Sequence, residues 1–133
     1  MATENILELV SREAGSGIVN KRFVTEVAGG KVNIVLLSAT QSHGVVAMRS
    51  YGKTGATIAA GDECPVAKDG DVIVESGAAV ADGAEVMADT TGRAITFAAG
   101  VGAIATGKVV NGSSASAAGQ DLSVRLYKIG THI

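Results

Sequence analysis

A glycine-bounded pattern that occurs twice constrains the fold of this chain more than any other feature. Residues 55–63 (GATIAAGDE) and residues 77–85 (GAAVADGAE) share the pattern Gly-Ala-x-[Ile/Val]-Ala-x-Gly-x-Glu at an offset of 22 positions. Glycine at both ends of a tight connection adopts backbone angles that other residues reach only at a cost. Each copy therefore predicts a turn, a short strand and a second turn. The single Ile58 or Val80 between the glycines is suited to plugging one end of a barrel.

Two full copies and a shorter, partial copy at residues 102–107 are too few for a solenoid, which needs at least about three stacked units. The clearest strand pair is a hairpin of residues 23–27 and 31–37 around Gly29-Gly30, where apolar and polar residues alternate. Turn signals separate further predicted strands at residues 44–49, 71–75, 84–88, 93–98, 104–110 and 121–129. The sequence thus predicts an all-β fold, a small single-domain β-barrel or β-tulip-like fold of short antiparallel strands over residues 18–133.

The composition limits what can fill the core. The chain has 133 residues, of which 47% are hydrophobic but only 3% aromatic, so the core must consist of Val, Ile, Leu and Ala. Burial of a Val or Leu side chain contributes about 1.5–3 kcal/mol, and an Ala contributes less. We therefore expect contacts between subunits to supply part of the stability.

Residues 1–17 are expected to form a separate N-terminal segment, either a short helix or an extended arm. The apolar residues of this segment follow a helical spacing behind a possible Thr3 cap, but the stretch is too short to hold a helix alone. Gly15-Ser16-Gly17 is expected to form a flexible joint before the first predicted strand. Both alternatives remain open from the sequence. The apolar residues concerned are Ile6, Leu7, Leu9 and Val10.

Charge and cysteine content exclude several classes of partner. The formal net charge is −2 and the basic residues are scattered, so no basic stripe exists and nucleic acid is not expected as a partner. Cys64 is the only cysteine and is expected to be a core residue. The first five residues, Met-Ala-Thr-Glu-Asn, carry an acid where a secretory signal would carry basic residues, so we expect no such signal. No apolar run approaches the roughly 20 residues of a membrane span. We expect a soluble protein made in the cytoplasm, with no membrane partner.

No motif for catalysis or ligand binding is complete. Residues 100–105 match the GxGxxA form of a dinucleotide fingerprint, but later glycine and β-branched residues interrupt the helix that this motif needs. Ser42 and His43, with Asp62 or Asp69, lack any spacing that selects a catalytic triad. Two histidines and one cysteine offer no metal cluster. The sequence therefore predicts no cofactor, no metal site and no enzymatic activity.

The order of these pieces resembles the small capsid decoration, or cement, proteins of tailed phages, over nearly the full length. The most specific stretch is residues 74–95 (VESGAAVADGAEVMADTTGRAI), which is similar to that family's glycine-bounded turn, strand and hairpin. The strand Gly44-Val45-Val46, residues 102–107 and the closing residues 122–126 also look like the family's pattern. A second, partial resemblance, of residues 72–87 to biotinyl and lipoyl carrier domains, lacks the acceptor lysine after Met87.

The resemblance to decoration proteins implies a structural virion protein without catalytic activity. It would be made in the host cytoplasm and would bind the outer surface of the expanded capsid as a homotrimer. There it would stabilise the shell by bridging neighbouring subunits of the major capsid protein. The apolar N-terminal residues Ile6, Leu7, Leu9 and Val10 would bind the capsid, by adding a strand to the edge of a capsid subunit's sheet.

A different class of function remains open alongside this one. A tail-fibre or surface β module would bind glycan or protein, and such modules usually expose aromatic side chains that stack on sugars. The chain has only two Phe and two Tyr residues and no Trp. The low aromatic content favours the capsid protein over the glycan-binding module.

Overall fold

The computed structural model describes residues 4–34, 42–47, 57–99 and 103–127, and in these parts the chain forms strands and no helix. The all-β prediction is confirmed. The strands are β1 (Asn5–Ala14), β2 (Ile18–Val19), β3 (Phe23–Val27), β4 (Lys31–Ile34), β5 (Gly44–Val46), β6 (Thr57–Ile58), β7 (Glu63–Glu75), β8 (Glu85–Ala88), β9 (Ala94–Thr96), β10 (Gly107–Val109) and β11 (Asp121–Leu126).

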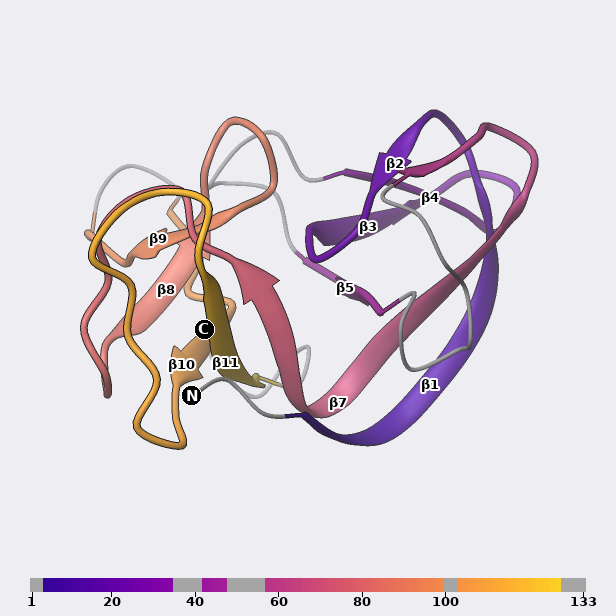
Figure 1. Ribbon diagram of the computed structural model, residues 1–133. Coiled ribbons are helices and arrows are strands. Elements are labelled where there is room, and N and C mark those ends of the chain that lie inside the picture. Colours follow the sequence, from indigo (N-terminus) through magenta and orange to yellow (C-terminus); the bar gives the residue numbers. More distant parts are fainter. Residues whose placement is uncertain (1–3, 35–41, 48–56, 100–102, 128–133) are drawn as a thin grey trace.

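Nine of the strands form one sheet that curls into two groups on either side of β7 (Figure 1). The order is β1-β4-β3-β5-β7-β11-β10-β8-β9, and an additional pairing of β1 with β7 closes the first five strands into a ring. The second group curves away from the other half of β7. A bridge between Ser76 and Ala94 brings β9 back beside the end of β7. Only the β1–β4 pairing is parallel among the named strand pairs of the described residues.

Strand β7 is shared by the two groups. Its first half pairs with β1 and β5, and its second half pairs with β11. The sequence predicted a strand only at residues 71–75, because Asp69-Gly70 is typical of a turn. The structure places Asp69-Gly70 inside the strand, and the 13 residues of β7 hold the two groups together.

The first copy of the repeat contains the predicted short strand, β6, whereas Val80 of the second copy forms only an isolated bridge with Ala115. Ile58 and Val80 are 6% and 2% exposed, and each is followed by a turn whose glycine, Gly61 or Gly83, has a positive φ of 89° or 81°. The glutamate that ends each copy begins a strand, β7 in the first copy and β8 in the second. Ile58 packs in the core of the first group and Val80 in the core of the second. Each copy of the repeat therefore contributes one apolar side chain to the core of one group.

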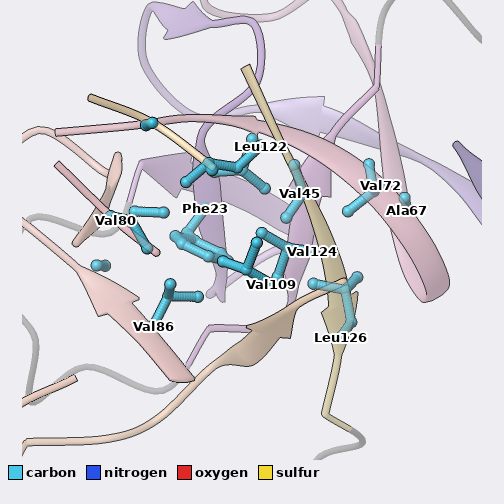
Figure 2. Close-up of a cluster of buried hydrophobic side chains, with 14 of the residues drawn as sticks. Phe23, Val45, Ala67, Val72, Val80, Val86, Val109, Leu122, Val124 and Leu126 are labelled. Atoms are coloured by element: carbon cyan, nitrogen blue, oxygen red, sulfur yellow. The ribbon is translucent and has the colours of Figure 1, made fainter. Parts of the chain in front are cut away.

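The buried side chains form two clusters, made mainly of valine and alanine as the composition predicted. The smaller cluster fills the ring and includes the predicted core residue Cys64. The larger cluster lies between the ring wall and the second group, and Figure 2 shows Phe23 of β3 at its centre. On β5, Val45 faces the larger cluster and Val46 the smaller one. The wall of the ring is therefore buried on both faces.

The prediction of a short helix in the N-terminal segment is wrong. Residues 5–14 form strand β1, which is paired along its length with β7 of the same chain. The extended alternative describes the backbone, but the strand belongs to the sheet and does not stand apart as an arm. The pairing with β7 runs from Asn5 opposite Asp71 to Glu13 opposite Glu63, and this long pairing explains why the segment is part of the sheet.

Candidate functional site

The four apolar residues predicted to bind a partner do not share one surface. Ile6 and Leu9 are half-buried against the larger core cluster, and Val10 is half-buried against the smaller one. Leu7 differs, because its side chain is 69% exposed. The structure leaves only Leu7 of the four available as an exposed apolar contact.

A β-bulge at Leu7 directs its side chain outward. The register between β1 and β7 passes from Ile6 opposite Gly70 to Glu8 opposite Asp69, and it shifts again before Leu9. Bulges of this kind re-aim a side chain and increase the local twist. Gly70 permits the close approach, since its φ is +97° and a Cβ there would lie 2.3 Å from the carbonyl oxygen of Asn5.

The β1–β7 ribbon carries an excess of carboxylates. Glu8 lies opposite Asp69, and Glu13 lies opposite Glu63. Like charges directly opposite one another on paired strands are destabilising. The Glu13 carboxylate forms an ion pair with Lys31 at 3.2 Å.

The cations of this ribbon are held by a single glutamate on β3. Glu26 accepts a hydrogen bond from Arg12 Nε at 2.9 Å and another from Lys68 Nζ at 3.4 Å. The bond from Arg12, together with the charge of Lys68, holds the pKa of Glu26 below its ordinary value although burial opposes this. Arg12 and Lys68 are thus engaged with Glu26, and no described lysine or arginine forms an ion pair with Glu63.

An open groove of about 640 Å³ runs beside the second half of β1. Three of its lining residues are glutamates, and Arg12 is its one cation among the described residues. The lining comes from β1, from β3, from the turn before β4 and from the turn that leads into β7. It consists of Ser11, Arg12, Glu13, Glu26, Gly30, Gly61 and Glu63.

A buried carboxylate fixes the point at which β7 changes partners. Asp71 is 6% exposed and accepts hydrogen bonds from Arg125 Nε at 2.8 Å and Arg125 Nη2 at 3.1 Å. Asn111 Nδ2 donates to the same carboxylate at 3.3 Å and to Ser123 Oγ at 3.0 Å. The bonds from Arg125 lower the pKa of Asp71, Asn111 adds to this, and burial opposes it. The network is structural and ties β11 to β7.

We expect Asp71→Asn to cost about 2 kcal/mol of unfolding free energy at pH 7, because it removes charge-assisted hydrogen bonds. The folded-state pKa of Asp71 lies below the ordinary value of 3.8, so this contribution is present above about pH 4 and is lost as the pH falls through the folded pKa. The Tm difference between wild type and variant should therefore shrink from pH 7 to pH 2. Asp82→Asn, at an exposed turn, is the control and should change Tm little at any of these pH values. A difference that stays constant with pH would contradict this role for Asp71.

A second carboxylate holds the last described residue of the chain. The hydroxyl of Tyr127 donates a hydrogen bond to the Glu85 carboxylate, which joins the end of β11 to the start of β8. Burial, and then this bond, raise the pKa of Tyr127 to about 12. The phenol therefore stays protonated and keeps its donor at neutral pH.

The described side chains of the candidate triad form hydrogen bonds with nearby backbone groups. Nδ1 of His43 accepts the amide proton of Glu26 at 3.1 Å and lies 3.0 Å from Thr25 Oγ1. Ser42 Oγ donates to the carbonyl of Gly44 at 3.1 Å, and Asp69 Oδ1 accepts the amide of Gly70 at 2.8 Å. These contacts fix the start of β5 and the part of β7 that lies opposite the bulge at Leu7.

The described residues contain no group of three or more His, Cys, Asp or Glu side chains that could hold a metal ion. Residues 100–102 of the GxGxxA match lie outside the described residues, and residues 103–106 form no helix. None of the described segments is a helix long and apolar enough to cross a membrane.

The fold and the sequence both match phage proteins. The family model of the XM1 gp53 minor capsid protein matches residues 7–125, which include both groups of strands. The crystal structure of the head fiber gp8.5 N base in bacteriophage phi29 superposes with a TM-score of 0.67 at 14% identity, covering 90% of this chain and 93% of that chain. At this identity the likeness shows the shared fold. A comparison with curated proteins gave no match.

These findings confirm the expected resemblance at the level of a phage capsid-associated protein. The chain belongs to the family of the XM1 gp53 minor capsid protein and is a structural protein of the phage capsid.

Proposed function

We propose that this protein binds the exterior of the expanded capsid and stabilises it by bridging neighbouring subunits of the major capsid protein. The observation that carries this proposal is the match of a minor capsid family model to residues 7–125, which spans both groups of strands. A fold shared with the base of a phage head fiber is consistent with attachment to the head. The role is structural, and the protein acts without catalysis on the virion's outer surface.

The aromatic side chains favour a protein partner over a glycan. Phe23 is fully buried, and Phe97 and Tyr127 are half-buried, so the described residues include no exposed aromatic ring for stacking on a sugar. Tyr51 lies outside the described residues. The alternative of a fibre or surface module remains as a second candidate, since the similar phi29 structure is the base of a head fiber.

A homotrimer is part of the proposal. Multivalent attachment raises avidity by about 10² to 10⁴ without any single strong site. The core of small side chains and the two exposed apolar residues Leu7 and Val27 suit several weak contacts made at once. Light scattering on the free protein and counting of copies per capsid test this state, and a monomer in both settings would contradict it.

The proposed contact at Leu7 is tested by co-sedimentation with expanded, undecorated capsids, with unexpanded shells for comparison. Leu7→Asp should weaken binding to expanded shells at least about tenfold, the equivalent of 1.4 kcal/mol, because a desolvated apolar contact is replaced by a charge. The Tm should hardly change, since the side chain is 69% exposed. Ala118→Asp adds the same charge at an exposed turn of the second group and should bind like wild type. Equal binding by both variants would exclude Leu7 as a contact.

A further inference from the structure

One edge of β1 has backbone hydrogen-bonding groups that the described sheet does not use. On the side away from β7, the only described strand that pairs with β1 is β4, and it does so only at Glu13 and Ala14. Residues 5–12 of β1 therefore form an open edge in the described part of the structure (Figure 1). Such an edge is a template for pairing with another chain.

The pairing pattern shows which groups face outward. The amide of Ala47 donates to the carbonyl of Pro65 at 3.1 Å, so the backbone of Pro65 is directed toward β5 and away from β1. Ser11 lies opposite Pro65, and the two members of an antiparallel pair either exchange both hydrogen bonds or neither. The N–H and C=O groups of Ser11 therefore point away from β7, and those of Leu9, two residues earlier, point the same way. The exposed Ser11 carbonyl accepts a hydrogen bond from Arg12 Nη1 at 3.0 Å, which an added strand would have to replace.

The surface beside this edge is a groove rather than a flat wall. The groove of about 640 Å³ begins at Ser11, and its carboxylates are those of Glu13, Glu26 and Glu63. Glu63 lies opposite Glu13, and no described cation forms an ion pair with it. A lysine or arginine brought in by a partner would relieve the repulsion between these opposed carboxylates.

We propose that the edge of β1 from Leu9 to Glu13, with the adjoining groove, receives an extended segment of the major capsid protein that carries Lys or Arg. The segment pairs with β1 as an added strand, so main-chain hydrogen bonds supply affinity and its basic side chain enters the groove beside Glu63. Leu7 lies on the same strand and adds an apolar contact. This proposal rests on the proposed function and names the chemistry of its partner.

A second copy of this chain fits the edge less well. Every described lysine and arginine other than Lys108 already has an ion pair, as the bridges of Arg12, Lys21, Arg22, Lys31, Lys68, Arg93 and Arg125 show. Lys108 lies on β10, both edges of which are paired, with β8 and β11. The described part of a second copy thus offers no free basic strand.

Ser11→Pro tests the edge without disturbing the fold. Proline removes the outward N–H and blocks strand addition, while the pairing with β7 does not use that group. Binding to expanded capsids should fall about tenfold or more relative to Ser11→Ala, with the Tm of both variants within a few degrees of wild type. Ser11→Ala controls for loss of the hydroxyl.

Glu63→Lys tests the charge of the groove and does not depend on the tolerance of β1 for proline. It should weaken capsid binding about tenfold, whereas Asp82→Lys, the same change at an exposed turn of the second group, should not. Wild-type binding by both Ser11→Pro and Glu63→Lys would overturn the edge proposal and leave the proposed function standing. Failure of the wild-type protein to bind expanded capsids would overturn both. A change in oligomeric state of Ser11→Pro, with capsid binding intact, would assign the edge to a second copy instead.

Discussion

Gly70→Ala should lower the free energy of unfolding by about 3 to 5 kcal/mol, the largest effect we expect from adding one methyl group. The φ of Gly70 is +97°, and an added Cβ would lie 2.3 Å from the Asn5 oxygen and 2.7 Å from the Leu7 nitrogen. Both are backbone atoms, so relief requires β1 to move away from β7. Urea denaturation measures the loss, and added proteolysis within residues 5–14 would show that β1 has detached.

Gly83→Ala separates the two causes of that loss. The φ of Gly83 is +81°, similar to that of Gly70, but an added Cβ there meets no heavy atom within 4 Å. Its cost should be that of the positive φ alone, about 1–2 kcal/mol. Equal losses at the two glycines would contradict the close approach of β1 to β7 at the bulge.

Phe23→Ala should cost about 3–5 kcal/mol, a large part of the roughly 5–15 kcal/mol that stabilises a typical domain. Phe23 is 0% exposed and reaches from β3 into the larger cluster, where Figure 2 shows it among valines of the second group. The amide of Phe23 also donates to the Gly92 carbonyl at 2.8 Å. The side chain therefore couples the ring to the second group.

Calorimetry tests this coupling. Wild type should unfold in a single transition, and Phe23→Ala should lower the Tm strongly. Phe97→Ala makes the same chemical change at a half-buried position and should cost clearly less. A loss at Phe23 no greater than that at Phe97 would contradict the coupling of the two groups through this ring.

Local signals in the sequence predicted much of the fold. The hairpin of β3 and β4 depends on Gly29 and Gly30, which both have positive φ, and the two repeat copies depend on their glycines in the same way. The first half of β7 was missed because Asp69-Gly70 is typical of a turn in its local sequence. Pro65 is tolerated because its backbone faces β5, and Gly70 because it permits the bulge.

In the N-terminal strand, a bulge gives the apolar residues the spacing that is typical of a helix. Ile6, Leu9 and Val10 are the inward residues, and their spacing of three and four positions is that of one helical face. The bulge at Leu7 shifts the alternation by one residue, and the two sides of β1 then face two different clusters. Only the long pairing with β7, which joins residues far apart in the chain, distinguishes the strand from a helix.

The acidic groove had no sequence signal at all. Its glutamates come from β1, β3 and the start of β7, and each alone is typical of an exposed polar position. The closure of the ring brings them together, so they could be recognised only from the structure.

Cryo-electron microscopy of expanded capsids saturated with this protein tests the central claim most directly. We expect density on the outer surface in which each copy contacts at least two neighbouring major capsid subunits, with the β1 edge at one of these contacts. Density that touches a single subunit, or no added density on the expanded shell, would contradict the proposal that this protein stabilises the capsid by bridging its subunits.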